Sequence, residues 1–182
     1  MTQISNNKRI AKNTLLLYFR MIFMMAVSLY TSRVVLDALG VEDFGIYNVV
    51  GGVITLFSFV NGAMSSSTQR YITFELGKGN TSQLQKVFQT SMNVHLLVAL
   101  LILFLGETAG LWFFYEKMVI PPLRMVSAFW VYQFSIFTMM IMVVSVPYNA
   151  VIIAHERMST FAYISVFEVL LKLGIVYLLY LT

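Results

Sequence analysis

The stretch VFQTSMNVHLLVALLILFLGETAGLWFFY, residues 87–115, carries a single charged residue, Glu107. An α-helix rises about 1.5 Å per residue, so the hydrocarbon core of a bilayer, about 30 Å thick, needs about 20 apolar residues. The stretch is long enough to cross that core, with Asn93 and His95 near its start. It therefore predicts a transmembrane helix.

The whole chain has the same character. Of its 182 residues, 59% are hydrophobic and only 11% are charged, whereas a soluble domain usually carries about 25% charged residues. So few charges cannot cover a water-soluble particle of this size, which indicates an integral membrane protein. We expect an all-α bundle of about five transmembrane helices at 13–182, preceded by a polar cytoplasmic segment at 1–12. The other four predicted spans are 13–36, 44–64, 123–146 and 158–181.

Basic residues in the short loops predict the orientation, because lysine and arginine are retained on the cytoplasmic side. Placing the N-terminus in the cytoplasm leaves Lys117, Arg124 and, near the membrane edge, Arg33 on the opposite side. A larger group then falls in the cytoplasm: Lys8, Arg9, Lys12, Arg70, Lys78, Lys86 and Arg157. We therefore predict a cytoplasmic N-terminus.

No sequence pattern indicates an enzyme, a metal site or a nucleotide site. The chain has no cysteine, and His95 and His155 lack the spacing of metal ligands. The SSSTQR stretch (65–70) lacks a nucleophile motif, and GKGN (77–80) is not a phosphate-binding loop. The net charge of +4 falls mostly at the ends of apolar runs, so it is a topology signal. We expect no enzyme activity, no cofactor, no metal and no nucleic-acid partner.

Small and polar residues recur at helical spacing in and after the second run, among them Gly52, Ser58 and Gln69, with Asn61 and Arg70 beside them. Small residues on a membrane helix usually indicate close helix packing. The two amides and Arg70 make this face more hydrophilic than packing requires. A water-lined or substrate-lined face is therefore as well supported as simple helix packing. Both interpretations remain open.

Two arginines lie in the first run. Arg20 and Arg33 are 13 positions apart, or roughly 20 Å along a helix axis. Their long side chains can snorkel to the two membrane surfaces, which is the simpler interpretation for either one. The functional alternative places their charge in a cavity, where it attracts an anionic substrate such as phosphate or pyrophosphate.

The fifth run keeps two charges, Glu168 and Lys172. Glu168 lies about 15 Å from Met158 along the helix, near the middle of the bilayer, where a charge costs roughly 2.5–3.5 kcal/mol. Their i, i+4 spacing permits an ion pair that merely tolerates burial. Charged membrane residues usually face a bundle interior or water, so we favour an internal cavity wall that binds substrate or relays a cation or proton.

Two local signals concern helix ends and packing. Pro147 follows Val146 in the fourth run, and a proline either ends or bends a helix. We expect the helix to end there. Gly106 and Gly110 form a G-x-x-x-G pattern in the third run, which is a weak signal for close helix packing.

Five segments together resemble the N-terminal part of bacterial oligosaccharide flippases. These are the Wzx-type O-antigen and polysaccharide exporters of the multidrug/oligosaccharidyl-lipid/polysaccharide exporter superfamily, which has a MATE-like fold. The resemblance runs from about Lys12 to the end of the chain, and LGVEDFGIYN (39–48) is its most characteristic part. The segments are LYTSRVVLDALGVEDFGIYNVVGGV (29–53), NGAMSSSTQRYITFELGKG (61–79), VIPPLRMVSAFWVYQ (119–133), VPYNAVIIAHERMS (146–159) and FAYISVFEVLLKLGIVYLL (161–179).

The resemblance implies two helix bundles around a central cavity in the bacterial inner membrane. It implies that an undecaprenyl-pyrophosphate-linked oligosaccharide moves from the cytoplasmic to the periplasmic leaflet by alternating access, for lipopolysaccharide or surface polysaccharide biosynthesis. Membrane lipids and a coupling cation or proton are further partners. Five spans correspond to an incomplete N-terminal bundle, so we expect a fragment of a longer transporter. A cation-lined cavity for the pyrophosphate implies these candidates: Arg20, Arg33, Arg70, Glu168 and Lys172.

Two other functions stay open at this stage. One is a cation-coupled multidrug exporter of the same superfamily, which drug susceptibility on deletion with intact polysaccharide would indicate. The other is a membrane scaffold subunit that transports nothing, which a stop codon directly after Thr182 would favour.

We predict that Glu168→Gln or Lys172→Ala in the full-length protein abolishes surface polysaccharide, because each removes one charge assigned to the pathway. Protein abundance should stay unchanged. Gel analysis of the polysaccharide and an immunoblot of the membrane fraction measure the two quantities. Wild-type export in both variants would remove the pair from the transport pathway.

Overall fold

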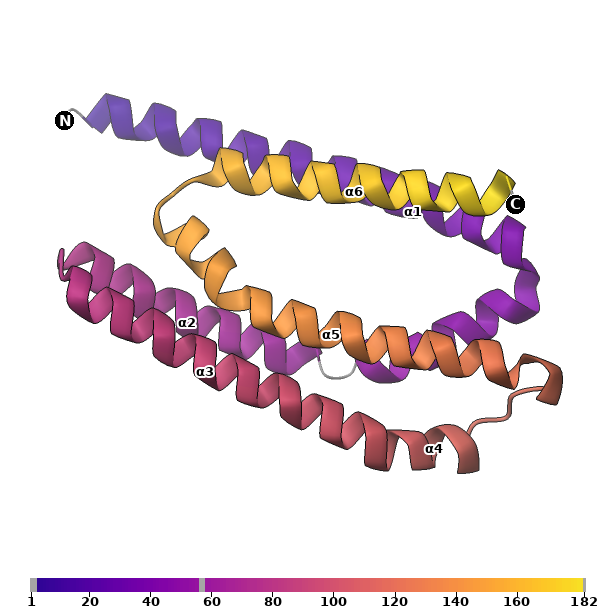
Figure 1. Cartoon of the computed structure of the whole chain (residues 1–182). Coiled ribbons are helices and arrows are strands. Elements are labelled where there is room, and N and C mark those ends of the chain that lie inside the picture. The colour runs from indigo at the N-terminus through magenta and orange to yellow at the C-terminus, as the bar shows by residue number, and fades with distance from the viewer. Residues whose placement is uncertain (1–2, 56–57, 182) are drawn as a thin grey trace. The chain divides into compact units, whose positions relative to one another are not determined.

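All regular structure in the described part of the chain is helical. The computed structural model describes the backbone of residues 3–55 and 58–181, and the side chains of residues 11, 13–52 and 61–178. The expected all-α fold class is confirmed (Figure 1). Along the chain the elements are α1 (Gln3–Thr55), α2 (Ser58–Gly77), α3 (Thr81–Leu105), the π-helical turn η1 (Gly106–Gly110), α4 (Leu111–Glu116), the 3-10 turn η2 (Pro122–Arg124), α5 (Met125–Ala154) and α6 (Met158–Leu181).

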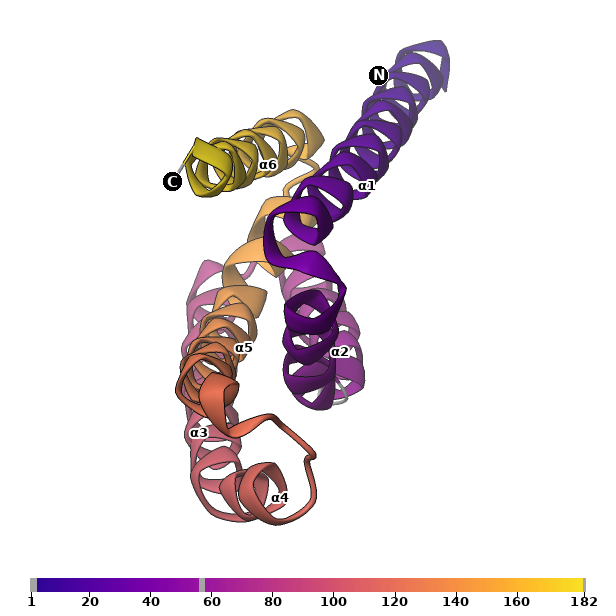
Figure 2. The same cartoon turned by 90° about the vertical axis from the view of Figure 1, so that its right-hand side faces the viewer.

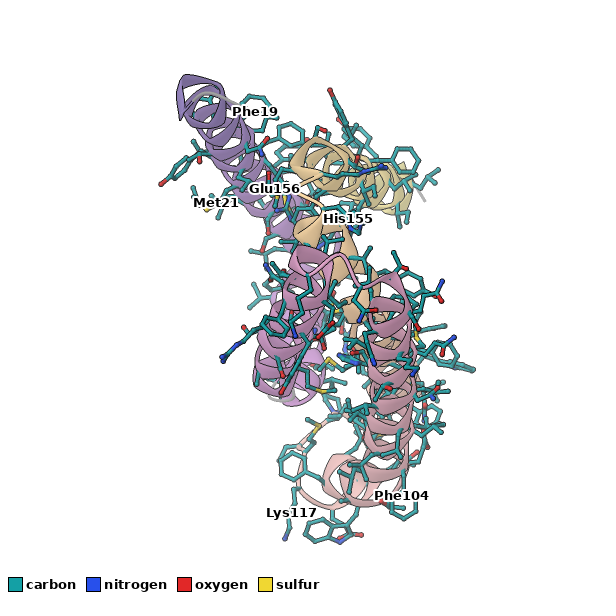
Figure 3. All side chains as sticks on the ribbon, turned by 90° about the vertical axis from the view of Figure 1, so that its left-hand side faces the viewer. Phe19, Met21, Phe104, Lys117, His155 and Glu156 are labelled. Carbon is teal, nitrogen blue, oxygen red and sulfur yellow. The ribbon has the colours of Figure 1, made fainter. Side chains whose placement is uncertain are left out.

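Four helical segments within the described residues are long and apolar enough to cross a membrane, and they make this a multi-pass membrane protein. They bear large apolar side chains that project outward. Phe19 and Met21 on α1 and Phe104 on α3 are each more than half exposed (Figure 3). Such outward-facing apolar surface suits a lipid environment. The four segments are Asn13–Gly52, Thr81–Glu116, Pro122–Ala154 and Met158–Leu178.

A single glycine divides α1. Gly40 has φ 74° and ψ 170°, which are not helical angles. A positive φ is readily adopted by glycine because it has no Cβ. This break falls inside the DALGVED segment, where the sequence predicts the connection between the first and second spans.

The second predicted span, 44–64, is distributed over two helices. Its first part belongs to the end of α1 and its last part to the start of α2, and residues 56–57 lie outside the described residues. The polar SSSTQR stretch continues the helix of α2 as far as Gly77. The apolar run therefore ends at Met64, whereas α2 continues to Gly77.

The expected helix end at Val146 is wrong. The fourth predicted span continues in α5 through Pro147 to Ala154. Proline removes the hydrogen bond that its own N–H would donate to the carbonyl of Val143. The side chains of Val143, Val146, Pro147 and Ala150 are all buried, so packing holds the helix together across the missing bond.

The chain divides into two compact units. One unit comprises Met1–Phe44 and His155–Thr182, and therefore contains the first part of α1 together with α6. The other comprises Gly45–Ala154 and contains α2, α3, α4 and α5.

In the unit Gly45–Ala154, α2, α3 and α5 all pack against one another (Figure 1, Figure 2). Apolar and aromatic side chains fill the space between the helices, with Phe114 and Tyr132 as the largest of them. The two rings have centroids 5.3 Å apart. The core cluster of this unit consists of Val50, Ala99, Ile102, Phe114, Ala128, Tyr132, Ile136, Met139 and Val143.

The close packing signalled by the G-x-x-x-G pattern is present at η1. The Tyr132 hydroxyl on α5 donates a 2.7 Å hydrogen bond to the carbonyl of Gly106. A Cβ at Gly106 would lie 2.7 Å from Cδ1 of Ile136, and a Cβ at Gly110 would collide with the Tyr132 hydroxyl. The missing side chains therefore let the backbone of η1 approach α5.

Gly110→Ala is expected to lower the free energy of unfolding by about 1–3 kcal/mol, because the added methyl group meets the hydroxyl of buried Tyr132. Gly174→Ala is the matched control, since a Cβ at this α6 position meets nothing within 4 Å. Thermal unfolding in detergent micelles compares the two variants. Equal midpoints would contradict a packing role for the G-x-x-x-G pattern.

Candidate functional site

A pocket of about 500 Å³ lies between α2 and α3, in the unit Gly45–Ala154. The α2 residues in it follow helical spacing and so share one face. Its wall combines one lysine, amide and hydroxyl groups, and a few apolar side chains. The lining residues are Met64, Ser67, Thr68 and Tyr71 of α2, and Gln83, Lys86, Val87, Thr90, Ser91, Val94 and His95 of α3.

His95 is the most buried polar side chain in this wall, with an exposed fraction of 2%. Its Nδ1 lies 2.7 Å from the carbonyl oxygen of Ser91. A carbonyl only accepts, so we assign the proton to Nδ1, which donates to it. Nε2 is buried and has no hydrogen-bond partner among the described residues.

A second pocket, of about 270 Å³, lies in the other unit. Tyr30, Arg33, Val34 and Asp37 of α1 line it, together with Tyr177 of α6. Arg33 is therefore part of a pocket wall, and its role in attracting an anionic substrate stays a prediction. Asp37 follows it by four residues and adds a carboxylate to the same wall.

Arg20, the other arginine of the first predicted span, is held against an aromatic ring. Its guanidinium carbon lies 4.2 Å from the centre of the Phe161 ring on α6. The side chain is half-buried, and its Nε has no hydrogen-bond partner among the described residues. Arg20 thus joins α6 to α1 and lines neither of the two pockets.

The order of these contacts shows how α6 runs along α1 within its unit. Arg20 meets Phe161, and Arg33 shares a pocket with Tyr177. Residue numbers therefore increase in the same direction along both helices, so α1 and α6 are parallel.

Glu168 and Lys172 are both exposed on α6. Neither forms a hydrogen bond or ion pair with another described residue, so the pair that their spacing permits is not formed. Each follows a packed residue, Ser165 or Val169, by three positions and lies at the border of the packed face. Neither lines the two pockets described above, and their role on a cavity wall stays a prediction.

The three candidates on α2 lie beside the α2–α3 pocket rather than in its wall. Asn61 and Gln69 are half-buried, and Arg70 is exposed. The Oδ1 atom of Asn61 is buried with no partner among the described residues. None of the three lines the α2–α3 pocket.

Sequence reasoning missed the α2–α3 pocket. The sequence did contain one indication of it, because the polar segments SSSTQR (65–70) and TSQLQK (81–86) lie on either side of the short turn GKGN (77–80). Two helices joined by so short a turn are antiparallel neighbours. Their polar faces therefore meet on one side of the turn.

No family model matches the chain, and no curated protein or solved structure matches it significantly. The flippase resemblance of the five sequence segments therefore stays an expectation.

Phe161→Leu is expected to lower the free energy of unfolding by about 1 kcal/mol, because it removes the ring beneath the Arg20 guanidinium. Phe167→Leu makes the same change on a ring that is 64% exposed, and serves as the control. Unfolding in mixed detergent micelles gives both values. A larger loss for Phe167→Leu would contradict the stabilising role of the Arg20–Phe161 contact.

Proposed function

We propose that this chain is the N-terminal part of a transporter that moves a lipid-linked oligosaccharide across the bacterial inner membrane. The transported molecule would serve lipopolysaccharide or surface polysaccharide biosynthesis. The multi-pass helical fold and the resemblance of the five sequence segments support the proposal. The cytoplasmic N-terminus and the alternating-access mechanism are parts of it.

The observation that carries the proposal is the position of Arg33. It lines a pocket between two membrane-length apolar segments, α1 and α6, in the company of Tyr30 and Tyr177. An arginine offers a planar fork of donors that matches phosphate oxygens, and it is charged at every physiological pH. A pyrophosphate-linked cargo supplies the acceptor groups that such a fork binds.

Asp37 in the same pocket limits how tightly an anion is held. Its carboxylate repels a phosphate while it attracts the Arg33 guanidinium. Opposed charges of this kind suit a transporter, which has to release its cargo as well as bind it.

The remaining candidates have subordinate parts in this proposal. Arg20 positions α6 through Phe161, and Glu168 and Lys172 lie at the border of the packed face of α6. Within the proposal, Glu168 is the group that binds a coupling cation or proton, because it is an intramembrane carboxylate. Lys172 adds positive charge one helical turn away.

Arg33→Gln in the full-length protein is expected to abolish export, because it removes the guanidinium from the pocket. Arg33→Lys should keep part of the activity, since it keeps the charge and loses the fork. Surface polysaccharide and the accumulation of lipid-linked precursor in cells lacking the native gene measure the effect.

Lys117→Gln is the control for this experiment. Lys117 is an exposed cation whose Nζ lies 5.4 Å from the centre of the Trp112 ring, and it lines neither pocket. We expect wild-type export from this variant. Undiminished export by Arg33→Gln, or changed drug susceptibility with intact polysaccharide, would contradict the proposed function.

A further inference from the structure

The α2–α3 pocket lies at the boundary between apolar and polar sequence. The predicted span before it ends at Met64, and the predicted span after it, 87–115, is predominantly apolar from Val94 onward; Met64 and Val94 both line the pocket. Residues 94–115 span roughly 33 Å of helix at 1.5 Å per residue, which matches a hydrocarbon core of about 30 Å. The polar part of the pocket, from Gln83 to Ser91, therefore lies at the level of the lipid headgroups.

The charge in the pocket selects an anion. Among the described residues that line it, Lys86 is the only one with a full charge, and there is no carboxylate. A bound cation would find no opposite charge there. Lys86 itself forms no hydrogen bond or ion pair with another described residue, so its ammonium group is available to a ligand.

The hydroxyl groups of the pocket are also available. Hydroxyls elsewhere in the helices bond back to their own backbone, as Ser135 does to Val131 and Ser165 to Phe161. By contrast, the serine and threonine hydroxyls that line the pocket make no hydrogen bond to another described residue. These side chains are Ser67, Thr68, Thr90 and Ser91.

The rest of the wall suits the start of an acyl chain. Met64 and Val94 supply apolar surface at the end of the pocket away from Gln83 and Lys86, and Val87 adds an apolar side chain among the donors. The available volume, about 500 Å³, lies within the 300–1,000 Å³ that is usual for ligand pockets. A ligand that fits this order has a phosphate at one end and a hydrocarbon chain at the other.

We infer that the α2–α3 pocket binds the headgroup of an anionic phospholipid from the membrane leaflet on the side of the α2–α3 turn. Lys86 pairs with the phosphate, while Gln83 and Thr90 donate hydrogen bonds to its oxygens. Basic pockets between transmembrane helices recognise anionic headgroups in this way. The site goes beyond the proposed transport function, because it contains none of the candidate transport residues and lies in the other unit.

Photo-crosslinking in vesicles tests the inference. The full chain is reconstituted in phosphatidylcholine that contains a small fraction of photoactivatable phosphatidylglycerol, with the reactive group near the start of the acyl chain. A parallel sample contains the same fraction of photoactivatable phosphatidylcholine. Mass spectrometry of the peptides maps the sites. Labelling of residues 64–71 and 83–95 by phosphatidylglycerol is expected to exceed labelling by phosphatidylcholine.

Two lysine variants separate the pocket from general attraction to the membrane surface. Lys86→Gln is expected to lower this labelling about fivefold, because the phosphate loses the one charged partner among the described residues of the pocket wall. Lys78→Gln is the matched control with the same change of charge. Lys78 lies outside the pocket, where its Nζ is 4.0 Å from the Glu75 carboxylate and 4.1 Å from the centre of the Phe74 ring. We expect it to label like the wild type.

Three outcomes would overturn the inference. Equal labelling by the two lipids would show that the phosphate charge is not recognised. Equal losses in Lys86→Gln and Lys78→Gln would show surface attraction alone. Complete competition by millimolar inorganic phosphate would identify the site as one for free phosphate instead of a lipid. Because the readout is labelling, failure of the transport proposal leaves this result unchanged.

Discussion

Backbone hydrogen bonding in hydrocarbon is the constraint on which this structure depends. Lipid offers no partner for an exposed N–H or C=O group, so a membrane span satisfies them within its own helix. The spans stay helical even where a residue disfavours a helix. α5 continues through Pro147, and several hydroxyls in the spans, such as those of Ser135 and Ser165, bond back to their own helix. The side chains around Pro147 are buried, and their packing compensates for the bond that proline lacks.

With the backbone committed to helices, glycine decides where the helices break and where they touch. Gly40 interrupts α1 with a positive φ. Gly106 and Gly110 do the opposite, because they are helical and their missing side chains admit Ile136 and Tyr132 from α5. The Tyr132 hydroxyl then finds its partner in the Gly106 carbonyl. One buried polar group is satisfied by the same close approach that packs the core.

Charges within the apolar segments are accommodated in different ways. Arg20 stacks on Phe161, whereas Arg33 lines a pocket with Asp37. Glu168 and Lys172 are exposed and make no contact of these kinds with a described residue. Charged residues in similar sequence surroundings therefore differ in whether they line a pocket. Arg33 lines the pocket of one unit and Lys86 lines the pocket of the other, and the anion contacts are proposed at these two residues.

The sequence by itself determined the fold class and the membrane character, because both follow from the length and hydropathy of single runs. The break at Gly40 was predictable in the same way, because it lies in the short polar segment between two apolar runs. Tertiary structure decided which polar residues meet. Thr68 and Lys86 share a pocket because α2 and α3 are antiparallel neighbours, and Arg20 meets Phe161 because α6 runs parallel to α1. Pro147 shows the same limit, since burial in a packed core keeps a helix intact where local propensity predicts its end.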